Sequence, residues 1–209
     1  MGVSVLILGH SGSGKSTSLR NFGEGEIGVF NVANKPLPFR NKLATVNKPG
    51  YNEIKATLKA NNLNAYCIDD ANYLMAFQNF ALAKQTGYSK FTDMAVNFEQ
   101  LLETANDTDS DTITYFLMHP DIDDTGRMKA KSIGKMLDNQ LTIEGMFPIT
   151  LLAFKDDSGY HFSTVSDGMT PVKTPMGMFE DAVIDNDLRA VDEAIRCYWG
   201  MAPLGGESK

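Results

Sequence analysis

Cysteine, tryptophan and histidine are scarce in this chain. Its 209 residues include two cysteines, one tryptophan and three histidines. Cys67 lies in an expected buried strand and Cys197 in an expected helix, and neither has the paired spacing of a metal site or a redox motif. His10, His119 and His161 also lack the spacing of zinc ligands. The sequence therefore argues against a disulfide framework and a zinc centre, and we expect both cysteines to be core thiols.

The chain also lacks an excess of positive charge and any long apolar run. It has 19 lysines and arginines against 26 aspartates and glutamates, for a formal net charge of −7. This balance disfavours a protein that coats nucleic acid with its whole surface. The apolar runs fall well short of the length that spans a bilayer, about 18 residues. The first expected strand begins at Val3 and leaves no room for a signal peptide, so we expect a cytoplasmic protein with no membrane partner.

Short apolar runs alternate with stretches of helical spacing along most of the chain. The runs are nearly continuous and rich in β-branched residues, as in strands buried on both faces of a parallel sheet. They cover Val3–Leu8, Ile27–Val32, Ala65–Ile68, Thr112–Met118 and Ile149–Phe154. Helices are expected at Lys15–Phe22, Tyr51–Ala60, Tyr73–Thr86, Phe91–Ala105 and Ser132–Ile143. This alternation predicts an α/β fold with a doubly wound, mostly parallel sheet flanked by helices.

The last quarter of the chain has a different pattern. Turn-forming residues at 156–159 precede the alternating segment Tyr160–Val165, which predicts a β-hairpin. Asp187 is placed to cap a final helix that extends to about Trp199. We expect one domain over residues 1–203 and a flexible tail at 204–209.

The most specific motif directly follows the first expected strand. Gly9 is followed after four residues by Gly14, Lys15 and Ser16, which is the spacing of a phosphate-binding P-loop. The glycines free the backbone to curl, so that successive N–H groups point into one anion-sized hollow. Lys15 would contact the outer phosphates of ATP, and the Ser16 hydroxyl would bind Mg²⁺ at the start of the next helix. The expected nucleotide site is therefore Gly9, His10, Ser11, Gly12, Ser13, Gly14, Lys15, Ser16 and Thr17, and the alternative is a turn that binds nothing.

Two acids at the end of the strand Ala65–Ile68 form a second motif. An acid in this position of a P-loop ATPase faces the magnesium ion held by the P-loop serine, and an acid beside it can polarise the attacking water. We assign Asp69 to the metal and Asp70 to the catalytic base. For Asp70 the alternative is a helix cap, because caps use the same residue type.

His119 follows the strand Thr112–Met118. In P-loop enzymes the strand beside the P-loop strand often ends in a polar residue that can sense the γ-phosphate through a hydrogen bond. His119 fits this catalytic position. The alternative is an ordinary loop or capping residue.

Basic residues gather after this strand. Arg127, Lys129, Lys131 and Lys135 occur with no acid among them, and Asp121, Asp123 and Asp124 lie just upstream. This segregation predicts contact with a polyanion. The alternative is a solvated loop and helix face.

The order of these parts resembles the RecA-like ATPases, and in particular the short phage-encoded ATPases that accompany single-strand annealing and recombination. The matching segments are GHSGSGKS at 9–16, YCIDD at 66–70, YFLMHPD at 115–121, GRMKAKSIGKML at 126–137, LLAFK at 151–155 and VKTPMGMF at 172–179. The resemblance covers nearly the whole chain, although only the first motif is specific. It implies a RecA-like core and a magnesium-dependent ATPase that forms a homo-oligomeric ring or filament on single-stranded DNA. Other phage replication or recombination proteins are the partners that it implies.

The resemblance also implies roles for individual basic residues. In that family a mobile loop after the fourth strand touches single-stranded DNA, and this loop corresponds here to Arg127, Lys129 and Lys131. Cations late in the core reach the nucleotide of the neighbouring subunit. In this chain Lys155 and Lys173 are the residues that could do so, as catalytic cations.

The chain departs from the family pattern in two respects. RecA carries a catalytic glutamate after the strand that follows the P-loop helix, whereas this chain has Ala33, Asn34 and Lys35 there, so hydrolysis is slow or absent unless Asp70 substitutes. The 121–135 loop has no aromatic residue to stack on bases, so DNA binding would rest on phosphate contacts. The alternatives are a nucleotide-dependent binding or packaging module with little hydrolysis, and a small-molecule P-loop kinase. The five arginines do not cluster as a kinase lid requires, which disfavours the kinase.

Overall fold

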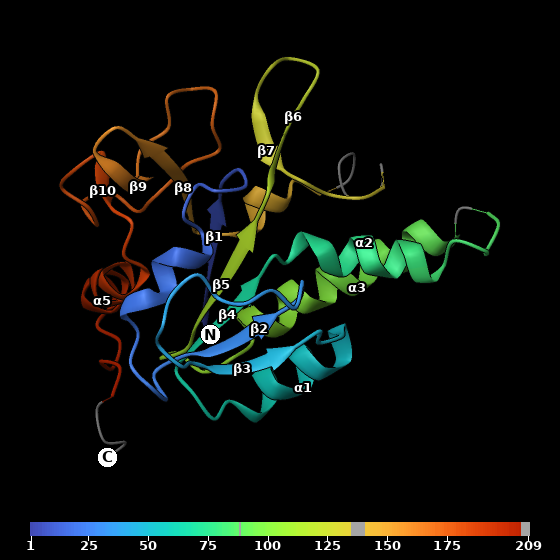
Figure 1. Ribbon diagram of the computed structural model, residues 1–209, viewed down its shortest axis with the longest axis horizontal. Coiled ribbons are helices and arrows are strands. Elements are labelled where there is room, and N and C mark those ends of the chain that lie inside the picture. The colour runs from blue at the N-terminus through green and yellow to red at the C-terminus, as the bar shows by residue number, and fades with distance from the viewer. Residues whose placement is uncertain (88, 135–140, 206–209) are drawn as a thin grey trace.

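A mixed, eight-stranded sheet lies at the centre of the computed structural model, which describes residues 1–87, 89–134 and 141–205 (Figure 1). Across the sheet the strands are β10 (Val183–Asp185), β9 (Gly159–Ser163), β8 (Ile149–Asp156), β1 (Val3–Leu8), β5 (Ile113–Met118), β4 (Ala65–Asp69), β2 (Gly28–Asn31) and β3 (Ala44–Asn47). The strands from β8 to β3 run parallel, and β9 and β10 are antiparallel to their neighbours. The expected α/β fold with a mostly parallel sheet is thus confirmed, together with the hairpin of β8 and β9.

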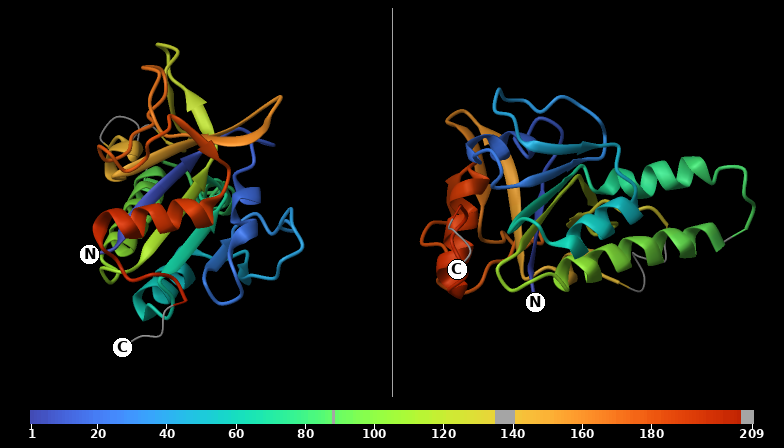
Figure 2. Two further views of the ribbon diagram at one scale, coloured as in Figure 1. Left: turned by 90° about the vertical axis from the view of Figure 1, so that its left-hand side faces the viewer. Right: turned by 90° about the horizontal axis from the view of Figure 1, so that it is seen from below.

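Helices cover both faces of the sheet. One face carries α1 (Tyr51–Ala60), α2 (Asn72–Ala81) and α3 (Ser89–Asn106), and the other carries the 3₁₀ helix η1 (Ser16–Asn21) and α5 (Leu188–Trp199) (Figure 2, right). Side chains of β1 alternate between the two layers: Leu6 and Leu8 pack with the first set of helices, and Val5 and Ile7 pack with the second. All four are fully buried, which explains why the strand reads as a continuous apolar run.

The segment after β5 differs most from the sequence prediction. Strands β6 (Pro120–Ile122) and β7 (Met128–Ala130) form a separate antiparallel hairpin that projects from the end of β5 (Figure 1). The helix expected at 132–143 lies partly outside the described residues, because 135–140 are not described, Lys135 among them. The flanking residues 132–134 and 141–142 are not helical, and a short 3₁₀ helix, η2 (Ile143–Met146), follows.

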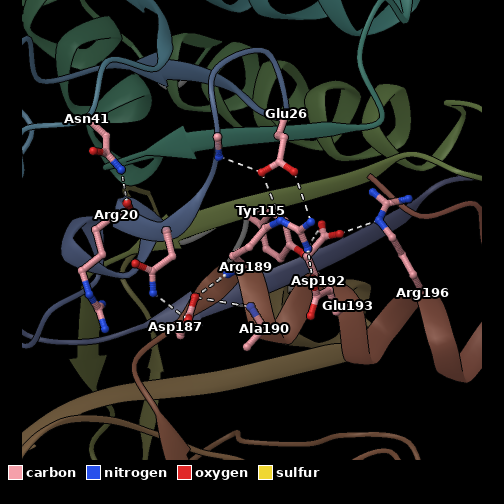
Figure 3. A network of polar contacts seen from close by, with 12 residues as sticks. Arg20, Glu26, Asn41, Tyr115, Asp187, Arg189, Ala190, Asp192, Glu193 and Arg196 are labelled. Atoms are coloured by element: carbon pink, nitrogen blue, oxygen red, sulfur yellow. Dashed lines mark hydrogen bonds and ion pairs between the residues drawn. The ribbon is translucent and has the colours of Figure 1, made fainter. Parts of the chain in front are cut away.

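The final helix is fixed to the sheet by polar contacts (Figure 3). The Asp187 carboxylate accepts hydrogen bonds from the main-chain N–H groups of Arg189 and Ala190, which confirms the expected cap. Deeper in the layer, Asp192 is ion-paired with Arg196 and accepts a hydrogen bond of 2.8 Å from the Tyr115 hydroxyl of β5. These contacts orient α5 across the sheet.

The C-terminal end of the chain departs from expectation at Cys197. Cys67 is buried, but Cys197 is exposed on α5, so the expectation of a core thiol is wrong for Cys197. The buried face of α5 runs through Leu188, Val191 and Ile195, which leaves Cys197 on the outer side. Leu204 packs partly buried against this layer, and 206–209 of the expected tail lie outside the described residues. None of the described helices combines the length and apolarity needed to cross a membrane.

Candidate functional site

The loop after β1 requires glycine at three positions. A Cβ at Gly9 would lie 2.3 Å from the Ser13 hydroxyl oxygen and 2.8 Å from a main-chain oxygen of Ala153. Gly12 and Gly14 have φ angles of +80° and +94°, which other residues rarely adopt. The glycine spacing seen in the sequence is thus a consequence of how tightly the backbone turns.

The curled loop leaves several polar groups without partners. Among the described residues, no hydrogen bond uses the main-chain N–H groups of Gly12, Gly14, Lys15 or Ser16. The buried Ser13 hydroxyl also has no hydrogen-bond partner among the described residues. A concave row of free N–H groups binds anions, so the loop fits the phosphates of a nucleotide. The helix that follows is a short 3₁₀ helix, whereas the sequence analysis expects a longer helix from residue 15.

Lys15 lies folded over this loop. Its side-chain amine donates hydrogen bonds of 2.6 Å to the Gly9 carbonyl and 3.0 Å to the His10 carbonyl, and the residue is 6% exposed. Burial lowers the pKa of Lys15 from 10.5 to about 8, although attraction to Asp70 and Asp69 partly offsets this effect. The loop therefore holds a nearly desolvated cation whose charge is available to an anion.

Ser16 and Asp69 meet in the structure although 53 positions separate them in the sequence. The Ser16 hydroxyl donates a hydrogen bond of 2.8 Å to Oδ1 of Asp69, at the carboxyl end of β4. Burial and the neighbouring Asp70 raise the pKa of Asp69 to about 6, while the Ser16 hydrogen bond and the charges of Lys15 and Lys35 act in the opposite direction. A further positive charge, such as a bound cation, would stabilise the ionised form of this buried carboxylate.

A hydroxyl and a carboxylate beside a phosphate loop match the preference of Mg²⁺ for oxygen ligands. Within residues 1–87, 89–134 and 141–205, no cluster of three or more His, Cys, Asp or Glu side chains forms a complete metal site. Ser16 and Asp69 would therefore supply two protein oxygens, and nucleotide phosphates and water would supply the rest. This arrangement is the usual one for Mg²⁺, which is rarely bound by an all-protein cage.

Asp70 combines an unusual backbone conformation with contacts to a lysine and a histidine. Its φ angle is +62°, and its carboxylate contacts the Lys35 amine at 2.7 Å and Nε2 of His119 at 3.3 Å. Burial alone raises the pKa of Asp70, but the hydrogen bonds from His119 and Lys35 outweigh burial and hold the pKa below its ordinary value. The capping alternative is wrong, because α2 begins after Ala71 without a side-chain cap.

His119 occupies the centre of the site, because β5 lies between β1 and β4. Its main-chain N–H donates to the Asn72 side-chain oxygen at 3.1 Å, and its ring packs edge-on against the Tyr73 ring at 5.8 Å between centroids. These contacts fix the imidazole toward Asp70. His119 therefore lines the pocket beside Asp70, and its catalytic role stays a prediction.

These side chains surround one open pocket of about 350 Å³. The loop contributes Ser11, Gly12, Gly14, Lys15, Ser16 and Thr17, and the strand ends contribute Asp69, Asp70 and His119. The sequence analysis missed two further lining residues with functional groups, Lys35 and Tyr160. Lys35 follows β2, so the rule that carboxyl ends of parallel strands meet at one edge could have found it. Tyr160 comes from the antiparallel strand β9, and no sequence signal pointed to it.

Lys155 and Lys173 lie near opposite ends of β8. The Lys155 amine lies 5.2 Å from the centre of the Tyr160 ring, near the rim of the pocket. Lys173 forms an antiparallel bridge with Thr150 and lines a separate hollow with Met1, at the amino end of β1. The structure does not bring the two lysines together, and their action on a neighbouring subunit stays a prediction.

The basic run lies on the β6–β7 hairpin, where acids accompany it. Asp121 is paired in register with Lys129, and the Asp123 carboxylate accepts hydrogen bonds from the main chain of Thr125 and Arg127 at the turn. The segregation of charge along the sequence is therefore largely lost in space, because the hairpin folds the acidic strand onto the basic one. At the base of the hairpin, the Lys131 N–H donates to the His119 carbonyl at 2.9 Å.

Comparisons with known proteins do not name a family. A scan against protein-family models finds no matching family, and a search of curated proteins finds no significant match.

Proposed function

We propose that this chain is a RecA-like P-loop ATPase that binds ATP with Mg²⁺ and hydrolyses it slowly. The observation that carries the proposal is the hydrogen bond between Ser16 and Asp69 at the mouth of the glycine loop. It joins the two residues that P-loop ATPases use for magnesium, and each was assigned from a separate motif. The mostly parallel sheet, with the loop at the end of a central strand, supports the same proposal.

In this proposal each residue has a defined task. The free N–H groups of the loop hold the phosphates, and Lys15 neutralises their charge. Ser16 and Asp69 hold Mg²⁺, which when bound offsets charge on the transferred phosphoryl group. Asp70 orients the attacking water and accepts its proton, and the imidazole of His119 lies beside Asp70 to sense the terminal phosphate.

The state of Asp70 supports slow hydrolysis. A carboxylate paired with the Lys35 amine at 2.7 Å is a weak base, because the cation stabilises its ionised form. This observation also favours the second candidate, a nucleotide-dependent binding or packaging module with little turnover. A turnover measurement distinguishes the ATPase from the binding module. Only the ATPase should hydrolyse ATP faster when single-stranded DNA is added.

Single-stranded DNA is the partner that we propose for a homo-oligomer of this ATPase. The β6–β7 hairpin supports this part, since it starts directly after His119 and its base is hydrogen-bonded to the His119 carbonyl. A ligand on the hairpin could thereby act on the nucleotide site. The acids on the same hairpin imply weak, salt-sensitive binding.

The test measures ATP binding by isothermal titration with and without Mg²⁺, for the wild type and for Lys15→Met. We expect magnesium-dependent binding in the wild type and its loss in the variant, because Lys15 supplies the loop's cation. Lys42→Met, which removes an exposed lysine from the loop after β2, is the matched control and should bind like the wild type. Unchanged binding by Lys15→Met would contradict the proposal. Turnover with and without an oligonucleotide then separates the ATPase from the binding module.

A further inference from the structure

The main chain at Lys35 is clamped from both sides. The Asn31 side chain, at the end of β2, accepts a hydrogen bond from the Lys35 N–H at 3.1 Å and donates one to the Lys35 carbonyl at 2.7 Å. The same amide donates to the Asn47 side chain at 2.9 Å, which ties the clamp to β3. Asn31 is 5% exposed. Lys35 is therefore built into the end of the sheet, unlike a lysine on a free surface loop.

The side chain of Lys35 has more freedom than its main chain. The side chain is 61% exposed, whereas that of its partner Asp70 is 9% exposed. Apart from the Asp70 contact of 2.7 Å, the amine lies 5.3 Å from the centre of the Tyr73 ring. The amine can thus leave Asp70 for another anion without any movement of the fold, because no buried packing depends on its position.

The nearest place for such an anion is the pocket that Lys35 itself lines. Lys15, in the loop after β1, and Lys35, in the loop after β2, both line this pocket, and each lowers the cost of placing negative charge between them. The glycine loop cradles the inner phosphates of a nucleotide. Asp70 and the two residues that contact its carboxylate, Lys35 and His119, line the same pocket, so a terminal phosphate that extends beyond the loop would face them.

We propose that Lys35 is a second phosphate-binding cation, which leaves Asp70 and binds the terminal phosphate when a nucleoside triphosphate occupies the pocket. The inference rests on the proposed nucleotide-binding function and adds an exchange of ion pairs to it. A nucleoside diphosphate lacks the outer phosphate and leaves the Lys35–Asp70 pair intact. The site therefore distinguishes triphosphate from diphosphate, and in the triphosphate complex the Lys35 amine stays close enough to Asp70 for this carboxylate to remain a weak base.

The first experiment compares the affinities of ATP and ADP in the presence of Mg²⁺ for the wild type, Lys35→Met and Lys35→Arg. Loss of one charge-assisted hydrogen bond should weaken ATP binding about tenfold in Lys35→Met and leave ADP binding within about twofold of the wild type. Lys35→Arg retains the charge and should retain most of the preference for ATP. Lys42→Met again controls for the loss of one positive charge from the same loop.

The second experiment tests the exchange itself with a double-mutant cycle. Asp70→Asn removes the charge that competes for Lys35, so ATP affinity should rise in the wild-type background. In the Lys35→Met background this gain should shrink by about threefold or more, because no lysine remains to be released. For ADP the two substitutions should be independent.

The outcomes separate the two proposals. If the wild type binds ATP but Lys35→Met has the same ratio of ATP to ADP affinity, the role of Lys35 is wrong and the P-loop function stands. Equal gains from Asp70→Asn with and without Lys35 would also refute the exchange. If the wild type binds neither nucleotide, the proposed function and this inference both fail.

Discussion

The buried charge of Lys15 destabilises the folded state, and this destabilisation can be measured. Its pKa falls from 10.5 to about 8 because the side chain is buried in the loop. At about 1.4 kcal/mol per pKa unit, the difference corresponds to roughly 3 kcal/mol of folding free energy at neutral pH. Removal of this charge should therefore stabilise the fold while it abolishes phosphate binding.

The sign of the pH dependence follows from the direction of the shift. The unfolded chain holds the Lys15 proton more tightly than the folded protein, so it binds more protons between about pH 8 and 10.5. The contribution of Lys15 to the free energy of unfolding is therefore least favourable below about pH 8, and it becomes more favourable as the pH rises from about 8 to 10.5. Between about pH 7 and 9.5 the gain is about 2 kcal/mol.

Lys15→Met isolates this contribution. The variant lacks the charge but also lacks the hydrogen bonds to the Gly9 and His10 carbonyls, each worth about 1 kcal/mol. We expect it to be about 1 kcal/mol more stable than the wild type near pH 7 and to lose this advantage by about pH 9.5. Urea unfolding of both proteins across the range gives the difference directly. A difference between wild type and variant that does not change with pH would refute the reasoning, and Lys42→Met should show no such trend.

Three other variants test separate parts of the molecule. Asp69→Asn should weaken ATP binding in the presence of Mg²⁺ and have little effect in its absence, so equal titrations of variant and wild type with Mg²⁺ would exclude Asp69 as a ligand. Asp192→Ala leaves the Arg196 charge buried without its carboxylate and should cost about 3–5 kcal/mol in urea unfolding, a loss that a surface pair would not produce (Figure 3). Replacement of Lys129 and Lys131 by alanine should flatten the salt dependence of oligonucleotide binding by about 0.7 for each phosphate that the protein no longer neutralises. An unchanged slope would mean that these lysines do not bind DNA.

Much of the fold could be predicted because its signals are local. Strands such as β1 and β5 are buried on both faces and therefore read as continuous apolar runs. The Asp187 cap depends on residues next to it in the chain, and so does the turn of the β8–β9 hairpin. Short or exposed strands lacked such a signal: β3 and β10 lie toward the edges of the sheet, where few apolar side chains are needed.

The glycine loop after β1 could also be predicted from the sequence alone, because its conformation depends mainly on contiguous residues. Gly12 and Gly14 are required by their positive φ angles and Gly9 by its closeness to the Ser13 hydroxyl, and all of these lie within one turn of backbone. Asp69 could be assigned for a related reason, since an acid at the end of a parallel strand lies at the same edge as the loop. Its contact with Ser16 follows from that shared edge.

Only the tertiary structure decided which charges face one another. The order of the strands places His119 between the loop and Asp70, and the end of β2 brings Lys35 to the same carboxylate. The hairpin fold sets Asp121 opposite Lys129, although the sequence separates acids from bases. Strand order and register depend on packing between distant segments, whereas composition and spacing record only neighbours along the chain. The sequence by itself therefore determined the layered sheet and the glycine loop, and the packing of its strands decided that Asp70 is paired with a lysine.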